Sequence, residues 1–138
     1  MYSLLYVSSA SKPFSADELT ALLKSSRENN SRLDISGMLL YKDGNFMQLL
    51  EGEEAAVSGL YAKIVQDLRH KGPITLLRGP TPERSFAEWS MGFRELKSTL
   101  DPRVPGYADF LNTPLTSGDF VAHPTKAQKL LLMFKEKM

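Results

Sequence analysis

The sequence has no cysteine and only two histidines, His70 and His123. A chain without cysteine cannot form a disulfide, a thiolate nucleophile or a cysteine-based zinc site, and two histidines are too few for a histidine-rich metal site. An excess of one charge is missing as well, because 17 Lys and Arg balance 16 Asp and Glu to a net charge of +1. We therefore expect no bound metal and no basic surface for nucleic acid or an anionic membrane.

Long hydrophobic runs and the common catalytic motifs are also absent. No stretch approaches the ~20 apolar residues of a membrane span, and no basic region precedes the short apolar run at the N-terminus, as it would in a signal peptide. The glycine-rich nucleotide motifs, the G-x-S-x-G elbow and the H-E-x-x-H zinc motif do not occur. These absences predict a cytoplasmic chain without membrane contact, and they point to no enzyme.

The composition, with 42% apolar and 24% charged residues, is typical of one globular domain. Apolar and alternating segments predict strands at 2–8, 35–41, 46–50, 74–77 and 89–93. The Asp43-Gly44 pair between the second and third strands predicts a hairpin turn. Pro80 and Pro82, just after the fourth strand, confine it to a sheet edge or end it early.

Two helices are predicted between these strands. The first opens with the capping box Ser15 to Glu18 and carries an inward face that ends at Asn30. The second begins after Gly52 and is predicted to run to residues 69–71, before Gly72-Pro73. Its inward stripe includes Leu68.

The resulting order, β-α-β-β-α-β-β, predicts an α+β fold of the ferredoxin-like split β-α-β type with a five-stranded mixed sheet. Both helices cover one sheet face. Leu5, Val7, Met47 and Leu49 then form a second apolar face. We expect a domain over residues 1–95 and an extension over 96–138. The second face needs a cover, which a partner subunit could supply, but we expect the short helices of the extension to pack on it.

Three polar residues lie on faces that should be buried: Tyr6, Asn30 and Gln48. Buried amides and phenols need partners. One interpretation is structural, with Tyr6 and Gln48 bonded to each other and Asn30 capping the first helix. The other is a flat ligand with a polar edge, bound between the helices and recognised by Asn30 and Gln48, with Leu23 and Ile64 among the apolar walls.

The sequence resembles the BLUF family, whose members sense blue light through a bound flavin. The resemblance extends from Tyr2 to about Glu95. It rests on a series of motifs in the family's order: LYVSSA at 5–10, SRENN at 26–30, ISGMLLY at 35–41, GNFMQLLEG at 44–52, DLRH at 67–70 and RSFAEWSMGF at 84–93. Each motif alone is weak, but the full series is specific.

The resemblance implies a role for individual residues. Tyr6 and Gln48 match the photoactive pair, and Trp89 and Met91 match the two residues that exchange places beside the glutamine. Asn30 matches the asparagine that binds the ring edge of the flavin. Further cofactor-binding positions implied in the same way are Ser26, Asn29, Lys63, Asp67, Arg69 and His70. Which of Trp89 and Met91 lies next to Gln48 stays open.

The resemblance also implies a mechanism. FAD would bind non-covalently, with FMN or riboflavin as substitutes in preparations. Light-driven electron and proton transfer from Tyr6 would rearrange the hydrogen bonds of Gln48 and shift the absorption to the red. The residues after Glu95 are too few for an output domain, so we expect the signal to pass to a partner protein or to a change in homo-oligomer assembly.

Two other functions share the predicted topology. An acylphosphatase-like hydrolase would need an Arg in the loop 8–13, which has none. A small-ligand regulatory domain or an RNA-binding domain is the other alternative, although the nearly neutral charge disfavours RNA. A flavin absorption spectrum of the purified protein distinguishes all three.

Overall fold

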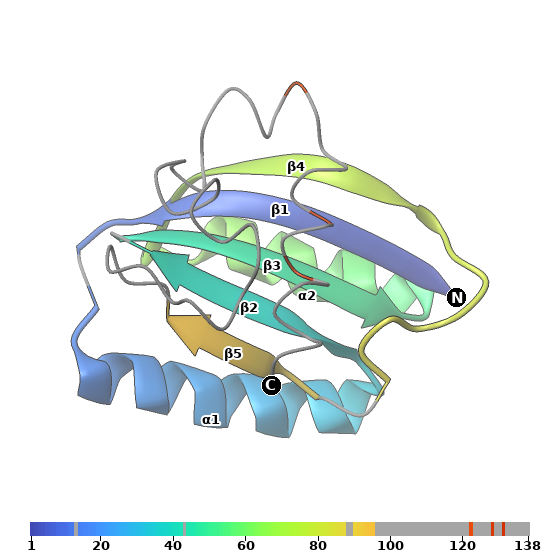
Figure 1. Ribbon diagram of the computed structural model, residues 1–138, viewed down its shortest axis with the longest axis horizontal. Helices are drawn as coiled ribbons and strands as arrows, with labels where there is room; N and C mark the ends of the chain where they lie inside the picture. Colours follow the sequence, from blue (N-terminus) through green and yellow to red (C-terminus); the bar gives the residue numbers. More distant parts are fainter. Residues whose placement is uncertain are drawn as a thin grey trace, which may run out of the picture.

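A computed structural model describes residues 1–12, 14–42, 44–87 and 90–95, together with Ala122, Gln128 and Leu131. Its elements follow the predicted order (Figure 1). They are β1 (Tyr2–Ala10), α1 (Ala16–Leu33), β2 (Ser36–Lys42), β3 (Asn45–Gly52), α2 (Glu54–Gln66), β4 (His70–Pro80) and β5 (Gly92–Glu95). The predicted α+β class is confirmed.

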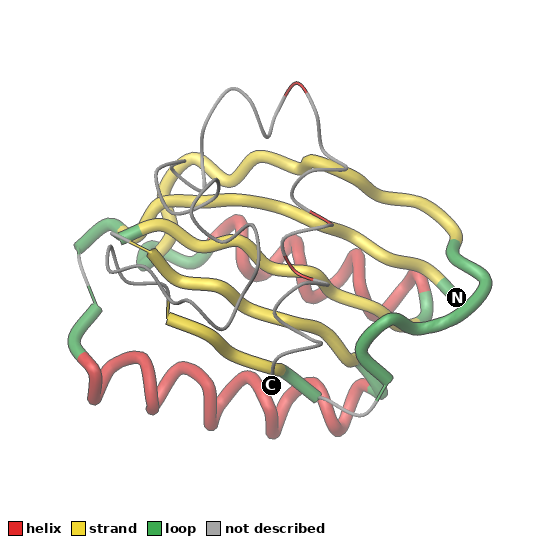
Figure 2. The backbone as a smooth tube through the Cα atoms, in the orientation of Figure 1, coloured by secondary structure: helices red, strands yellow, loops and turns green. Residues whose placement is uncertain are grey.

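The five strands form one mixed sheet in the order β4-β1-β3-β2-β5. The β1–β3, β1–β4 and β2–β3 pairs are antiparallel, and β5 lies parallel to β2 at an edge. Figure 2 shows α2 behind the sheet and α1 along its β5 edge. Residues of both helices pack in one core with the same side of the strands, so both helices cover the same face. This arrangement places β1 and β3 in the middle of the sheet, over the space between α1 and α2.

The two faces of the sheet bury different side chains. Toward the helices, the strands contribute Leu4, Tyr6, Leu39, Phe46 and Leu50 to a core that also contains residues of both helices. The alternate positions carry the second apolar face, whose members Leu5, Val7, Met47 and Leu49 are all buried. The predicted helices of the extension lie outside the described residues, apart from Ala122, Gln128 and Leu131. Leu131 is buried.

The β2–β3 hairpin forms as predicted, with Lys42 paired to Asn45 across the turn. Gly44 has φ +80°, a conformation that glycine adopts without steric cost. A second glycine of the hairpin, Gly37, is required by packing, because a Cβ atom there would lie 1.9 Å from the carbonyl oxygen of Leu49. The hairpin therefore holds β3 in one register against β2.

Helix α1 begins with the predicted capping box. Ser15 Oγ accepts from the Glu18 backbone N–H, and Glu18 Oε1 accepts from the Ser15 N–H. The helix continues past Asn30 to Leu33 and is capped by Asp34 in the left-handed conformation. The expectation that Asn30 is the helix cap is therefore wrong: Asn30 lies inside the helix and is 2% exposed.

The second helix is shorter than predicted. Helix α2 ends at Gln66, and Leu68, expected on its inward stripe, is 90% exposed. Residues 69–71 leave the helix because β1 is long enough to pair with them, with Ala10 opposite His70. The predicted stop at Gly72-Pro73 lies instead within β4, at a register shift where Gly72 has φ +60°. An edge strand tolerates a proline there, because its missing N–H has no partner to lose.

The last strand also differs from the prediction of 89–93. Strand β5 begins at Gly92, with Ser90 and Met91 immediately before it, and Trp89 lies outside the described residues. Within the described part of the chain, no helix is long and apolar enough to cross a membrane.

Candidate functional site

A cavity of about 190 Å³ opens between α1, α2 and the helix-covered face of the sheet. Its walls combine apolar side chains with amides, hydroxyls and charged groups. The lining residues are Tyr6, Leu22, Ser25, Ser26, Asn29, Asn30, Leu39, Phe46, Gln48, Leu60, Lys63, Ile64, Asp67 and Arg69. Three strands, two helices and the loop before β4 thus bring together residues that are far apart in the sequence.

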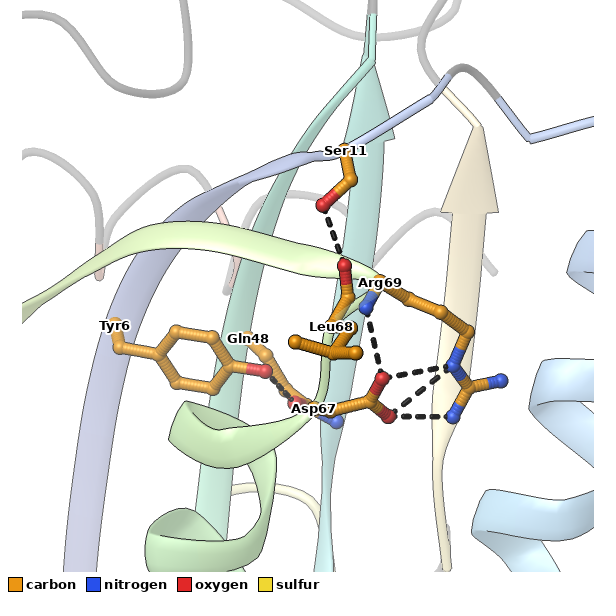
Figure 3. Close-up of polar contacts among 6 residues, drawn as sticks. All are labelled: Tyr6, Ser11, Gln48, Asp67, Leu68 and Arg69. Carbon is orange, nitrogen blue, oxygen red and sulfur yellow. Dashed lines mark hydrogen bonds and ion pairs between the residues drawn. The ribbon is translucent and has the colours of Figure 1, made fainter.

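Tyr6 and Gln48 form the polar centre of the cavity wall that the sheet provides. They are direct partners across the β1–β3 ladder, and the Tyr6 hydroxyl donates a hydrogen bond to Gln48 Oε1 (Figure 3). Their exposed fractions are 1% and 6%. The mutual bonding expected in the structural interpretation is therefore present, and it lies in the wall of a cavity.

The surroundings of Tyr6 keep its phenol protonated. Burial, followed by the neighbouring Tyr61 and Asp67, raises the pKa of the Tyr6 phenol well above its ordinary value. The Tyr61 ring lies 5.0 Å from the Tyr6 ring, centroid to centroid, and the Tyr61 hydroxyl accepts a hydrogen bond of 3.0 Å from Thr75 Oγ1. Tyr6 is thus a neutral hydrogen-bond donor with a second aromatic ring packed against it.

The other end of the Gln48 amide contacts Met91. Gln48 Nε2 donates to Met91 Sδ at 3.4 Å, and Met91 is 2% exposed. Met91 therefore lies next to Gln48 in this structure. The sequence had left open whether Met91 or Trp89 would do so. Tyr6 and Met91 each bond one side of the amide, so together they select its orientation.

The two adjacent asparagines of α1 reach the cavity in different ways. Asn30 Nδ2 donates to the Ser90 carbonyl oxygen at 2.8 Å, so the buried amide ties α1 to the segment before β5. Asn29 Oδ1 accepts a hydrogen bond of 2.7 Å from Arg32 Nη2 on the outer part of the helix. Each amide keeps further donor or acceptor capacity.

Charged residues gather at the exposed rim of the cavity. Arg69 binds Asp67 in an ion pair with a closest distance of 2.7 Å (Figure 3). The hydrogen bonds to Asp67 raise the pKa of the Arg69 guanidinium, against a smaller opposing effect of burial. Lys63 on α2 adds a second cation.

The structure places most of the predicted site residues around this one cavity. Those that line it are Tyr6, Ser26, Asn29, Asn30, Gln48, Lys63, Asp67 and Arg69. Met91 contacts Gln48 from outside the lining. For His70 only the backbone is described, as part of β4, and Trp89 lies outside the described residues. Within the described part, no cluster of acidic or histidine side chains could hold a metal ion.

The sequence interpretation missed part of the cavity wall. Ser25, Leu22, Leu60, Leu39 and Phe46 also line it, while Leu23, which we expected in the wall, packs in the core. The pairing of β2 with β3 could have identified Leu39 as a wall residue, because Leu39 lies opposite Gln48 in the register. Strand pairing depends on the fold, so the sequence pattern alone did not identify these neighbours.

A model of the BLUF family, described as "Sensors of blue-light using FAD", matches residues 1–92. The chain belongs to the BLUF family. Among curated proteins it is similar to the photoactivated adenylate cyclase subunit beta of Euglena longa, with 39% identity over 72% of this chain and 12% of that protein. The subunit alpha of Euglena gracilis is 34% identical over 74% of this chain and 10% of that protein. The chain thus spans about a tenth of the length of these relatives.

Solved BLUF structures have the same fold. The dark-state structure of BlrB, a BLUF protein, is 30% identical, with a TM-score of 0.73 over 93% of this chain and 96% of that one. The photo-activated state of BlsA is 27% identical, with a TM-score of 0.75 over 95% of this chain and 94% of the other. These likenesses confirm the ferredoxin-like sheet with two helices.

The residues around the cavity fit FAD, the cofactor of the family. A flavin ring is flat and apolar with a polar edge, and the cavity offers apolar walls together with the amides of Asn30 and Gln48. The dinucleotide part carries negative charge, and Lys63 and Arg69 lie at the rim.

Proposed function

We propose that the chain is a blue-light photoreceptor that binds FAD non-covalently in this cavity and signals through the Tyr6–Gln48 pair. The observation that carries the proposal is the hydrogen bond from Tyr6 to Gln48 in the cavity wall. It joins a buried phenol to an amide whose other end already has a partner in Met91. Two partners with different chemistry give the amide a defined resting orientation.

Bound FAD supplies the blue-light absorption and, when excited, an electron acceptor. Tyr6 is the residue suited to supply an electron together with a proton, because burial keeps its phenol protonated. Gln48 can both donate and accept hydrogen bonds, so its amide can relay the proton and adopt a new orientation. The rearranged amide would offer a different group to the cofactor edge, and the absorption would shift to the red.

The remaining lining residues would hold the cofactor. Asn30, with Asn29 and Ser26 beside it on α1, would bind the polar edge of the ring. Lys63 and Arg69 would face the phosphates, with Asp67 holding the Arg69 side chain in place. For His70 and Trp89 we propose the roles that the family resemblance implies. His70 would bind the cofactor, and Trp89 would be one of the two residues that exchange places beside the glutamine. FMN or riboflavin would satisfy the same ring contacts.

The output is proposed to pass to a downstream protein or to a change in homo-oligomer assembly. Relatives support a downstream partner, since their names include photoactivated adenylate cyclase and a bacterial light-regulated adenylyl cyclase. Another relative is named with cyclic diGMP, Klebsiella pneumoniae BlrP1. The BLUF part of such proteins is a sensor, and we propose the same non-enzymatic role for this chain.

The test is a light-minus-dark absorption spectrum of the purified protein with FAD bound. We expect a flavin spectrum and a reversible red shift. Gln48→Leu should still bind FAD, because leucine fits beside the apolar side chains of Leu39 and Phe46 and the other lining residues are unchanged. It should lose the red shift, because it has no amide to reorient. Val65→Ala, at an exposed position of α2 outside the cavity lining, is the matched control and should keep it. A normal red shift in Gln48→Leu would overturn the proposal.

A further inference from the structure

Two consecutive carbonyl groups before β5 are held by side chains of α1. Asn30 Nδ2 donates to the Ser90 oxygen at 2.8 Å, and Arg27 Nε donates to the Met91 oxygen at 3.0 Å. Arg27 and Met91 are 64 residues apart in the sequence. Figure 1 shows α1 beside the β5 edge of the sheet, where these bonds join the two.

Met91 is thereby fixed at both ends. Its side chain accepts from Gln48 Nε2 at 3.4 Å, and its backbone oxygen accepts from Arg27. The Met91 side chain is unbranched and flexible, so without a fixed backbone it would not hold its sulfur at one place. A guanidinium donor forms a charge-assisted hydrogen bond, which is stronger than one between neutral groups.

The position of Met91 in the sheet makes its hydrogen bond to Arg27 important. Strand β5 has four residues and, among the described residues, pairs only with β2, at the edge of the sheet. The register begins with Gly92 opposite Met38, so Met91 itself precedes the ladder. The Arg27 side chain therefore ties the Met91 carbonyl, at the entry to this short strand, to α1.

We propose that Arg27 is a positioning residue that acts through Met91 to set the orientation of the Gln48 amide. The proposal rests on the function proposed above and extends it from the cavity to the surface helix. Arg27 touches neither Tyr6 nor Gln48 and lies outside the cavity lining. A change at Gln48 that displaces the Met91 backbone would strain the bond to Arg27, so the same contact links the cavity to α1.

The first test needs no light. The ε-methyl resonance of Met91 in the protein carrying ¹³C-methyl methionine reports the position of that side chain, with and without FAD. Arg27→Ala should shift or broaden this resonance, and alanine keeps the helix because it has the highest helix propensity. The control is Lys24→Ala, one turn earlier on α1, which removes the same charge from an exposed side chain that makes no hydrogen bond within the described residues. Equal spectra for the two variants would overturn the proposal.

The second test uses the FAD-bound protein and its return to the dark state. Arg27→Ala should change the recovery rate by about twofold or more, in the direction that Met91→Ala changes it. In the double variant the effects should not add, because both act on one contact. Additive effects would show that Arg27 does not act through Met91. If the unaltered protein shows no red shift, the proposed function fails, while the methyl resonance still decides the Arg27–Met91 contact.

Discussion

The Tyr6 hydroxyl and the Gln48 amide meet because the two residues are opposite each other in the β1–β3 ladder. Both strands lie in the middle of the sheet, with neighbours on either side. The backbones are therefore held firmly, and only side-chain rotation can change the contact. Substitution of either side chain should alter the hydrogen bond without moving the cavity.

Tyr6→Phe should bind FAD and fail to form the red-shifted state, because the phenolic proton is gone while the ring still fills its place. Tyr61→Phe is the matched control: it keeps the ring against Tyr6 and loses only a hydroxyl bonded to Thr75. It should retain the red shift. Light-minus-dark spectra at equal flavin occupancy measure the effect. A reversible red shift in Tyr6→Phe would contradict the proposed role of Tyr6.

Asn30→Ala should weaken FAD binding by roughly 1–3 kcal/mol, because the ring edge loses its amide and the Ser90 carbonyl loses its donor. A fluorescence titration of cofactor-free protein with FAD measures the affinity. Ser31→Ala, at the next and exposed position of α1, serves as control. Unchanged affinity in Asn30→Ala would mean that this asparagine only connects α1 to the segment before β5.

Stability should fall at alkaline pH because of Tyr6. Its folded-state pKa is raised by burial, while the unfolded chain releases the proton near pH ~10. The contribution of the buried phenol is therefore complete below about pH 10 and is lost as the pH rises further, by ~1.4 kcal/mol per pH unit. Urea unfolding at about pH 9 and about pH 11 should show a smaller loss in Tyr6→Phe than in the unaltered protein. Equal losses would indicate an ordinary phenol.

Truncation after Glu95 should expose the second apolar face and promote aggregation. Leu5, Val7, Met47 and Leu49 are buried although both helices lie on the opposite face, and Leu131 is buried too. Light scattering and thermal unfolding of the truncated protein measure the effect. A monomeric fragment as stable as the full chain would show that the extension does not cover this face.

Local sequence patterns predicted most of the fold. The capping box at Ser15, the hairpin between β2 and β3 and the two apolar faces of β1 each depend on residues close in the chain, and each prediction agrees with the structure. The end of α2 did not follow its local pattern. His70 and Lys71, predicted at the C-terminal end of that helix, belong to β4 instead, because pairing with β1 satisfies their backbone groups at the sheet edge.

The sequence alone identified the inward positions of Tyr6, Asn30 and Gln48 and the resemblance to the BLUF family. It did so because strand and helix periodicity are local and the motifs occur in a fixed order. Only the tertiary structure placed Met91 against Gln48, 43 residues away, and joined Arg27 to the Met91 carbonyl. Those contacts depend on how β5 adds to the edge of the sheet next to α1. Sheet pairing and helix packing join residues far apart in the chain, so no local pattern records them.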